Sequence, residues 1–528
     1  MDQLPSDLVQ RLEKALRPDG LRTDLHARTL YAQDVFTKDL PVLAVLRPRN
    51  IEELASAVKL ATADGLAIVP RGGGMSYSSG YVPLVEQTVT LDMSGMNRVL
   101  EINDVDMYVT VECGCTWQEL HEILEPMQLR TTYWGTLSGR MATVGGSLSQ
   151  NSIFWGSGQY GTAADCVLSL QVVLADGTVL ETGSQAQRHC PPFFRHYGPD
   201  LTGIFTSDCG ALGIKATATL RLMPTLSAQQ YCAFDFEDGT AMLNAMSAIS
   251  RSGLATECFG FDPFLQMQRM KRDSVSQDVA SLANVMKQAD SVTHALKEGA
   301  KIAFAGRRYM TDVDYSLQVI TEDLNQTSAD ERATQVKALA LGFGAREIEN
   351  SIPKIVRANP FGPLNNMVGP NGERWVPSHV VVPHSRAVAS YQEILSLFDG
   401  HADEFRAFEI QTGFLFATIA TNGFVIEPVF YWPDALTEIH EESVEEDHIK
   451  RLQCFPENLE ARQKVAQVRN EFAAHFCQSG GIHLQIGKSY RYKEGLQDST
   501  LSLLRSIKAH VDPKGLMNPG SLGLDAAS

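Results

Sequence analysis

The stretch LAIVPRGGGMSYSSG (66–80) starts as a short apolar strand pattern and runs directly into three consecutive glycines. Because glycine has no side chain, Gly72, Gly73 and Gly74 leave their backbone N–H groups unobstructed and can adopt positive φ. Successive N–H groups in such a turn form a concavity that binds anions, such as a diphosphate. Glycine content alone fits a tight surface loop equally well. The sequence around the loop therefore has to decide between the two.

Short strand patterns alternate with helical patterns on both sides of this glycine loop. LAVLRP (43–48), TVTLDM (88–93) and MYVTVECG (107–114) predict strands. IEELASAVKLATADG (51–65) and TWQELHEILEPM (116–127) predict amphipathic helices, the second with its leading threonine as N-cap. The alternation is irregular, so we expect a mixed α+β domain and not a uniform series of βαβ units.

The β-rich pattern returns several times further along the chain. Residues 167–183 contain an Asp-Gly pair between two apolar runs and predict a hairpin, and 214–224 predict a strand. Residues 274–345 are polar and helical in character. WVPSHVVVP (375–383) and the stretch 408–432, which has an Asn-Gly turn, predict further strands.

The overall composition is that of an ordinary globular protein of two or three domains. The chain has 528 residues, of which 44% are hydrophobic and 20% charged, with a formal net charge of −17. An acidic surface repels nucleic acid and anionic lipid, so neither is an expected partner. No apolar run is long enough to span a membrane, and the N-terminus lacks the pattern of a secretory signal. Nine scattered cysteines, without metal-ligand spacing, indicate reduced thiols and a cytoplasmic protein.

A literal GxGxxG motif occurs at Gly156, Gly158 and Gly161. In a nicotinamide-binding unit this motif follows a strand and opens a long helix. Here only five residues separate it from the next strand, which leaves no room for such a helix. We therefore predict that it binds no nicotinamide. Gly145, Gly146 and Gly161 are better explained by a backbone that lies close to something flat or bulky.

Five motifs in a fixed order carry a resemblance to a known family. They are RPRNIEELASAVKLA (47–61), PRGGGMSYSSG (70–80), ATVGGSLSQNSIFWGSGQYGTAADCVLSLQVVLADG (142–177), GPDLTGIFTSDCGALGIKATATLRL (198–222) and VDPKGLMNPGSLG (511–523). The pattern resembles the flavin-binding domain of the vanillyl-alcohol oxidase and para-cresol methylhydroxylase (PCMH) family, which includes D-lactate and glycolate dehydrogenases. The resemblance implies an FAD-binding domain over 1–225, a separate α+β cap domain for the substrate over 226–475, and a C-terminal segment, 476–528, that returns to the first domain.

The resemblance also implies which residues hold FAD. Residues Arg71 to Ser76 would cradle the diphosphate, with Gly72, Gly73 and Gly74 donating backbone hydrogen bonds. Gly145, Gly146 and Gly161 would approach the cofactor from the other side, Gly210 and Ile214 would lie near the adenine half, and Asn518 near the isoalloxazine ring. Many relatives carry a flavin-bound histidine in the glycine loop, where this chain has Met75. We therefore expect FAD to be held noncovalently.

Candidate substrate-binding residues occur in SGGIHLQIGKSYRYKEG (479–495). Some 2-hydroxy-acid-oxidising relatives carry a Glu-His pair here; this chain keeps His483 and the Ile-Gly-Lys end but lacks that pair. In phenol-oxidising relatives a Tyr-Arg pair near this place and a tyrosine from the glycine loop bind the substrate as phenolate. Tyr490, Arg491 and Tyr77 match that arrangement. An arginine stabilises either a carboxylate or a phenolate, and an ordinary surface pair is the alternative.

Two residues of the predicted cap complete the candidate set. His379 and His384 flank a strand pattern at a spacing that places them on opposite faces, so at most His379 would line a cavity. A lone histidine beside a core strand is more often structural. Glu427, in the hairpin stretch, is a candidate general base. No His-rich metal motif is present, so we predict no metal.

These observations predict an FAD-dependent oxidoreductase that takes hydride from the alcohol carbon of a small substrate. A D-2-hydroxy acid is the preferred substrate, and a para-substituted phenol or aryl alcohol the alternative. A flavin-fold subunit without redox activity is an alternative of another class. The electron acceptor stays open between oxygen, a quinone and a cytochrome. Because dimers are common among the relatives, the resemblance also suggests a homodimer.

Overall fold

The structure is a computed structural model that describes residues 3–38, 41–272 and 313–524. Contacts between residues divide the chain into two compact units. The first comprises 1–153, 162–225 and 473–528, and the second comprises 154–161 and 226–472. Most of the predicted polar helical segment 274–345 falls on residues 273–312, which lie outside the described residues. The expected α+β class is confirmed, since both units combine sheets with helices.

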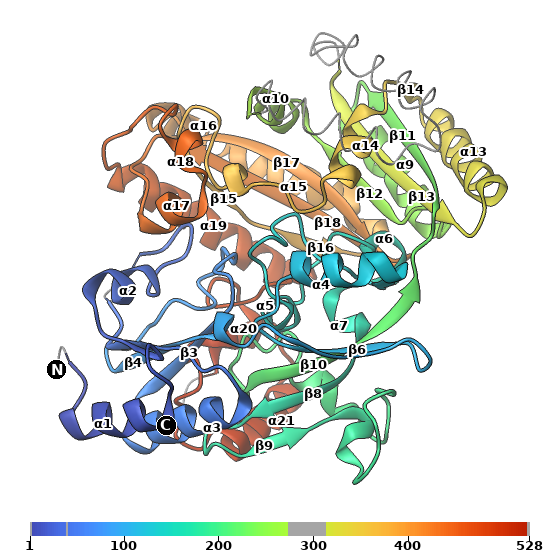
Figure 1. Ribbon diagram of the computed structural model, residues 1–528. Coiled ribbons are helices and arrows are strands. Elements are labelled where there is room, and N and C mark those ends of the chain that lie inside the picture. The colour runs from blue at the N-terminus through green and yellow to red at the C-terminus, as the bar shows by residue number, and fades with distance from the viewer. Residues whose placement is uncertain (1–2, 39–40, 273–312, 525–528) are drawn as a thin grey trace. The chain divides into compact units, whose positions relative to one another are not determined.

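The glycine loop belongs to a four-stranded sheet of the first unit. Its order is β1 (Leu21–Arg22), β2 (Ala44–Leu46), β4 (Thr88–Asp92) and β3 (Ala67–Arg71). Strands β2, β4 and β3 are parallel, and β1 is antiparallel to β2. Helices α1 (Ser6–Ala15) and α3 (Ile51–Ala63) pack their apolar faces onto this sheet (Figure 1). The predicted strands and helix between 43 and 93 are thus confirmed.

The C-terminal segment extends the open edge of this sheet. Met517 forms a parallel bridge with Ile68 of β3, and the Ile68 N–H donates to the Leu516 carbonyl at 2.8 Å. Helices α20 (Tyr492–Gly495) and α21 (Asp498–Val511) precede this contact. Residues 516–518 therefore lie beside the strand that leads into the glycine loop.

The second sheet of the first unit is antiparallel. Its order is β5 (Val99–Asn103), β6 (Tyr108–Glu112), β10 (Ile214–Pro224), β8 (Val167–Val173) and β9 (Val179–Glu181), with β7 (Leu129–Thr131) also paired to β10. The predicted hairpin over 167–183 is confirmed by the antiparallel β8–β9 pair. Around the sheet lie α4 (Trp117–Leu124), α5 (Val144–Gln150), α7 (Ala163–Cys166) and α8 (Leu201–Ile204), whereas α2 (Leu25–Leu30) packs beside β2 of the first sheet. Thr116 caps α4 as predicted, and its partner in the capping box is Glu119.

The second unit contains an eight-stranded sheet in which every pair is antiparallel. The order is β14 (Arg346–Glu347), β11 (Ala228–Phe236), β13 (Tyr315–Asp323), β12 (Glu257–Phe261), β17 (Gln411–Ile419), β18 (Gly423–Trp432) and β15 (Arg374–Pro377), with β16 (Val380–Val382) also paired to β18. Strands β17 and β18 form the predicted Asn-Gly hairpin, with Ile419 opposite Gly423.

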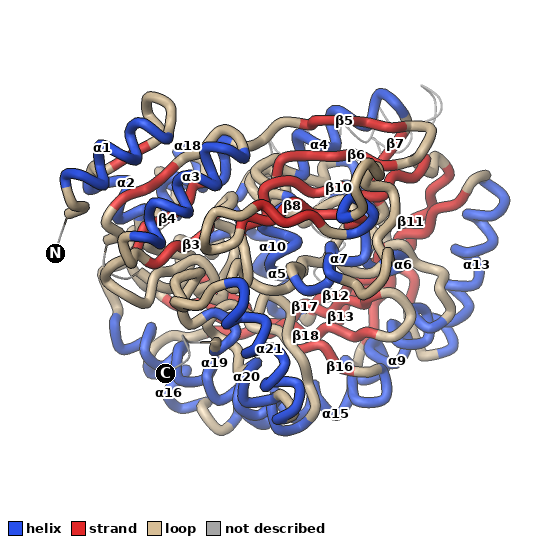
Figure 2. The backbone as a smooth tube through the Cα atoms, turned by 90° about the horizontal axis from the view of Figure 1, so that it is seen from below, coloured by secondary structure: helices blue, strands red, loops and turns tan. Residues whose placement is uncertain are grey.

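Helices cover both faces of this sheet (Figure 2). A Cβ on Gly260 of β12 would meet Met242, so this face carries α9 (Gly239–Arg251). The neighbouring residue Phe261 points to the other face, where Arg269 of α10 (Pro263–Arg272) lies over its ring. The remaining helices of the unit are α6 (Ser157–Tyr160), α13 (Gln326–Gly342), α14 (Ser351–Ala358), α15 (Ala387–Asp399), α16 (Ala402–Ala407), α17 (Glu438–Ser443), α18 (Glu446–Ile449) and α19 (Leu459–Ser479), the last of which runs on into the first unit.

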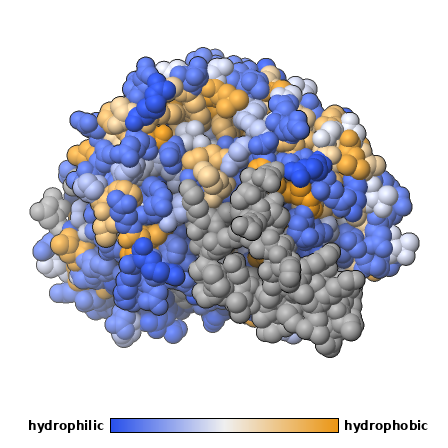
Figure 3. Space-filling model, turned by 90° about the horizontal axis from the view of Figure 1, so that it is seen from above, coloured by the Kyte–Doolittle hydropathy of each residue, from blue (hydrophilic) through white to orange (hydrophobic). Residues whose placement is uncertain are grey.

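The described part of the surface is mostly hydrophilic on the face seen in Figure 3. The hydrophobic residues on this face occur in scattered groups. Among the described helices, none is long and apolar enough to cross a membrane.

Candidate functional site

The glycine loop after β3 presents unpaired backbone donors. Among the described residues, the N–H groups of Gly73, Gly74, Met75 and Ser76 donate no hydrogen bond to the protein. Gly74 has a φ of 73°, a conformation that few side chains tolerate. Because buried or half-buried N–H groups are almost always paired in a folded protein, four unpaired donors in succession indicate a place for an anionic ligand.

Close packing explains why the loop needs its glycines. A Cβ on Gly73 would overlap the carbonyl oxygen of Met141, and a Cβ on Gly72 would overlap the Thr143 hydroxyl. Thr143 also caps α5, where its Oγ1 accepts the Gly146 N–H at 3.1 Å. The glycine loop is therefore pressed against the turn that begins α5.

The predicted roles of Gly145 and Gly146 become more specific. The Gly145 N–H donates to the Cys113 carbonyl at 2.8 Å, and the Gly146 N–H is held by Thr143. A Cβ on Gly145 would lie 2.8 Å from that same Cys113 oxygen. Gly145 is thus required by backbone packing, and neither N–H group is available to a cofactor.

Arg71, at the start of the glycine loop, is held by contacts with the segment before it in the fold and with Tyr81. Its guanidinium donates to the Leu30 carbonyl at 2.6 Å and lies over the rings of Tyr31 and Tyr81, at 4.4 and 5.3 Å. The Tyr81 hydroxyl in turn donates to the Gly74 carbonyl. In the described part of the chain Arg71 has no carboxylate partner, so its charge adds to the positive potential of the loop.

Asn518 joins three segments that are distant in sequence. Its side-chain Nδ2 donates to the carbonyls of Gly80, at 2.7 Å, and Cys209, at 2.6 Å, and its Oδ1 accepts from Lys488 Nζ at 2.8 Å. The residue is fully buried. Since both polar atoms are already paired, Asn518 fixes the surroundings of the loop. Its proximity to the flavin ring stays a prediction.

Two further predicted cofactor residues lie near the same strands. Gly210 has a φ of 73°, and a Cβ on it would crowd the ring of Pro70, directly before the glycine loop. Ile214 begins β10 and is buried in the apolar core beneath the sheet. The structure therefore brings Gly210 to the loop and gives Ile214 a role in packing. A position near adenine stays a prediction for both.

The tail segment brings two of the predicted catalytic residues together. The His483 and Tyr490 rings stack with centroids 4.1 Å apart and planes 11° apart. Tyr490 is almost fully buried, whereas the Arg491 side chain is exposed; the Arg491 carbonyl accepts from the Cys477 thiol and from the Gly495 N–H. Tyr77 is half-buried in the loop after Ser76. The Tyr-Arg pair is thus split between a buried ring and an exposed cation.

Sequence analysis did not identify Lys488 as a site residue. Its Nζ donates to the Val82 carbonyl and to Asn518, and its N–H donates to the Ser78 carbonyl at 2.9 Å. Burial lowers the pKa of this lysine to about 7. The only sequence signal was its place at the end of the Ile-Gly-Lys pattern, which says nothing about burial.

In the second unit, strand pairing places Glu427 and His379 opposite each other on neighbouring segments of the sheet. Pro377 pairs with Val429 and Val380 with Ile426, so this register sets His379 opposite Glu427. His379 is 6% exposed. The structure thus brings together two candidates that the sequence left separate. His384 instead lies in a turn, where its ring contacts the Thr421 carbonyl at 3.1 Å.

Glu427 lies on the face of the sheet that carries α10. It pairs with Leu415, which pairs with Phe261, and directly paired residues share a face. Arg269 of α10 lies over the Phe261 ring on this face, 4.7 Å from its centroid. Burial raises the pKa of Glu427 to about 7, and the Arg269 charge opposes that rise. A carboxyl group with a pKa near neutrality suits a general base.

The GxGxxG segment packs onto the sheet of the second unit and forms only the four-residue helix α6. A Cβ on Gly158 would lie 2.6 Å from the Thr256 carbonyl, and the Gly156 N–H donates to Glu257 at 2.8 Å. Gly161 ends α6 with a φ of 91°. Close backbone packing therefore requires Gly158, a residue for which the sequence predicted no such role. Gly161, which the resemblance placed among the cofactor residues, belongs to the second unit.

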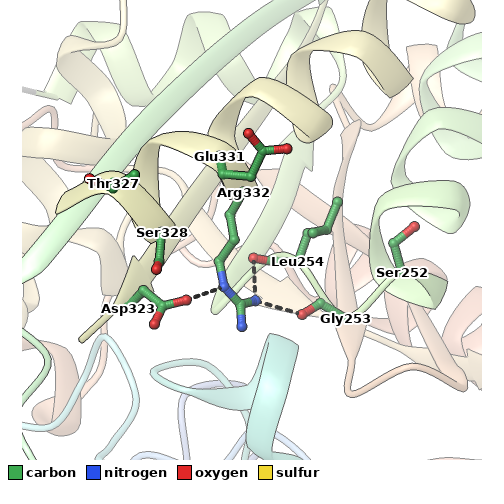
Figure 4. Close-up of a pocket in the computed structure, with 8 residues that line it drawn as sticks. All are labelled: Ser252, Gly253, Leu254, Asp323, Thr327, Ser328, Glu331 and Arg332. Carbon is green, nitrogen blue, oxygen red and sulfur yellow. Dashed lines mark hydrogen bonds and ion pairs between the residues drawn. The ribbon is translucent and has the colours of Figure 1, made fainter. Parts of the chain in front are cut away.

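A surface pocket of about 550 Å³ in the second unit is not the predicted site (Figure 4). Arg332 is already tied inside it, to Asp323 at 2.7 Å and to the Gly253 carbonyl at 3.0 Å. The pocket lies between the end of α9 and the start of α13, on the side of the sheet away from Glu427. Its lining residues are Ser252, Gly253, Leu254, Asp323, Thr327, Ser328, Glu331 and Arg332.

No group of three potential metal ligands occurs within the described residues. The absence of a metal from the reaction stays a prediction.

Comparison with known proteins identifies the domains. Residues 42–183 match the family model of the FAD binding domain, and residues 486–522 match that of the C-terminal domain of FAD linked oxidases. The first match contains the glycine loop and α5, and the second contains Lys488 and Asn518.

Two curated relatives are D-lactate dehydrogenases by name. The mitochondrial D-lactate dehydrogenase [cytochrome] of Arabidopsis thaliana is 34% identical over 238 residues, which are 44% of this chain and 40% of that protein. A probable mitochondrial D-lactate dehydrogenase of Danio rerio is 23% identical over 91% of this chain and 84% of that protein. The match spans less than half the length of the Arabidopsis relative and of two further curated relatives.

Among solved structures, p-cresol methylhydroxylase matches 98% of this chain and 96% of its own, with a TM-score of 0.73 and 17% identity. At this identity the likeness concerns the fold alone. It confirms the expected PCMH-type architecture. The unpaired N–H groups and uncompensated arginine of the glycine loop fit an anionic dinucleotide. The chain therefore contains a domain that matches the FAD binding family over residues 42–183 and a segment that matches the C-terminal domain of FAD linked oxidases over 486–522, in a fold like that of p-cresol methylhydroxylase, and FAD is the cofactor that these domains indicate.

Proposed function

We propose that this protein oxidises the alcohol carbon of a small D-2-hydroxy acid. The observation that carries the proposal is the sequence likeness to D-lactate dehydrogenases, which extends over 91% of the chain in one relative. FAD, when bound, supplies the hydride acceptor. The protein has to bind the carboxylate, orient the carbon and hold the hydroxyl proton.

Glu427 is the group that we propose for the proton. Its carboxyl group would accept the hydroxyl proton of the substrate, since a base with a pKa of about 7 is ionised in half of the molecules at neutral pH. His379, level with it across the strand pair, would orient that carboxylate or share its proton. Glu427 lies within β18, and His379 lies in the short connection between β15 and β16, both of which pair with β18.

The tail segment offers the groups for the anionic end of the substrate. We propose that Arg491 binds the carboxylate and that Tyr77 and the stacked His483–Tyr490 pair shape the site. The exposed guanidinium of Arg491 has no partner within the described chain, so no existing ion pair has to break first.

Anaerobic reduction tests this function directly. D-lactate should bleach the flavin absorbance of the purified protein, and L-lactate should not. Bleaching by vanillyl alcohol or 4-ethylphenol, with none by D-lactate, would instead establish the phenol-oxidising alternative, which the Tyr490–Arg491 pair favours. If FAD binds and none of these donors bleaches it, the subunit without redox activity is the remaining alternative.

We also propose that FAD is bound noncovalently, because Met75 occupies the loop position at which relatives carry the attached histidine. Acid precipitation should release the yellow colour into the supernatant. Colour that stays with the pellet would contradict this.

The acceptor and the assembly are proposals of the same kind. By analogy with the Arabidopsis relative, whose name includes a cytochrome, we propose a cytochrome over oxygen or a quinone. Rapid reoxidation of the reduced enzyme by cytochrome c, and slow reoxidation by oxygen, is the expected result. A homodimer and a cytoplasmic location complete the proposal, and light scattering and cell fractionation test them.

A further inference from the structure

Lys488 is a half-buried lysine whose amine has no carboxylate partner among the described residues. Its Nζ has two neutral partners, the carbonyl of Val82 and the amide oxygen of Asn518 at 2.8 Å. An ammonium group has three N–H donors, so one remains without a partner in the described part of the chain. No carboxylate there forms an ion pair with it. A positive charge on an amine that is largely shielded from water is costly unless an opposite charge is supplied.

Lys488 is linked to the unpaired end of the glycine loop. Its backbone N–H holds the Ser78 carbonyl at 2.9 Å, and the Ser78 hydroxyl lies 3.2 Å from the Ser76 hydroxyl. Ser76 is the last of the residues whose N–H groups lack a partner. The backbone of Lys488 is therefore connected to the end of the glycine loop through Ser78 and Ser76.

We propose that Lys488 is the charged ligand of an anionic group of bound FAD, and that it takes up its proton when the cofactor binds. The neutral amine gains one proton from solvent and becomes ammonium, and no other bond changes. The inference rests on FAD binding to this unit, and not on the identity of the substrate. It assigns a function to a residue that the sequence marked only as the end of the Ile-Gly-Lys pattern.

The neighbouring titratable groups leave Lys488 as the one that responds near neutral pH. Burial lowers its own pKa to about 7, so at pH 8 the amine of the free protein is mostly neutral. The Cys209 thiol beside it has a pKa raised to about 12 and stays protonated. Asp34, the other charge that acts on it, is held by the N–H groups of Phe36, Thr37 and Ser79, which favour the carboxylate.

The test uses the full chain, prepared without FAD from riboflavin-starved cells. Titration with FAD at pH 8 in two buffers of different ionisation enthalpy measures proton uptake, which should approach one proton per FAD. The dissociation constant should rise up to tenfold per pH unit above pH 7. In Lys488→Met both effects should vanish. Lys488→Arg should keep the affinity without proton uptake, and Lys14→Gln, an exposed lysine of the same unit, should behave as the parent.

ADP as a second probe identifies which anionic group is bound. Weaker ADP binding by Lys488→Met would place the lysine at the diphosphate. Unchanged ADP binding with weaker FAD binding would place it at the flavin ring. If the parent takes up no proton and Lys488→Met binds FAD as tightly as the parent, the inference is wrong. Since proton uptake is measured on the parent, a variant that fails to fold does not decide the test.

Discussion

The replacement Glu427→Gln tests the proposed base through both stability and rate. The substitution keeps the shape and size of the side chain but removes its ability to ionise. Glutamine thus reproduces the protonated carboxyl group that the buried position prefers. The two readouts separate a structural carboxyl group from a catalytic one.

The magnitude follows from the pKa of Glu427, which burial raises from 4.5 to about 7. At full strength a rise of this size corresponds to about 3 kcal/mol. The side chain is partly exposed and Arg269 opposes the rise, so solvent screening reduces the expected effect to about 1 to 2 kcal/mol. For a unit of this size that is several degrees in melting temperature, on the order of 2 to 4 °C per kcal/mol.

The sign is set by proton linkage. Between pH 4.5 and 7 the folded protein holds a proton on Glu427 that the unfolded chain has lost, so stability falls as the pH rises through this window. Above pH 7 the loss is complete. The Gln variant avoids this loss, so it should match the parent near pH 4.5 and melt several degrees higher at pH 8.

Thermal unfolding at pH 5 and pH 8 measures the stability difference, and anaerobic stopped-flow measures flavin reduction by D-lactate. The parent rate should rise through pH 7 as the base ionises, and the variant should be slower by about 10² to 10⁴ and lack this rise. Glu237→Gln, which removes an exposed carboxylate of the same unit, is the control. A variant that melts at the parent's temperature at pH 8 and retains the parent's rate would refute the reasoning for Glu427.

Three further substitutions test the packing that positions the site. Gly73→Ala should abolish FAD binding, measured by flavin absorbance after gel filtration, because the added Cβ overlaps the Met141 carbonyl; Gly362→Ala, with open space around it, should bind as the parent. Asn518→Ala should destabilise the protein by about 3 kcal/mol, since it leaves two buried carbonyls without donors, and unchanged thermal unfolding would contradict this. Arg357→Met should cost about 3 to 5 kcal/mol, because it removes the cation that pairs with the buried carboxylates of Glu257 and Glu322; adding Glu257→Gln should restore part of the loss, and full additivity would argue against the cluster.

The sequence by itself determined the local elements and the cofactor class. Strands and helices between 43 and 224 appear where they were predicted, since hydrophobic spacing, caps and turn residues within each short segment favour one type of secondary structure. The glycine loop was recognised because only glycine permits both its φ values and its close packing. The ordered motifs then pointed to FAD. The exclusion of a nicotinamide site at Gly156 rested on the five residues that separate the motif from the next strand, too few for a long helix. The four-residue helix α6 agrees with this exclusion.

Only the tertiary structure decided which distant residues meet. Residues 516–518 join the edge of β3, the GxGxxG segment packs onto the second unit, and strand register sets His379 opposite Glu427. These pairings arise from the burial of apolar faces and the pairing of backbone groups between remote segments, which local patterns do not encode. The same holds for Lys488: its contacts with Val82 and Asn518 and its lowered pKa come from the loops folded around it, and its neighbours in the sequence give no sign of them.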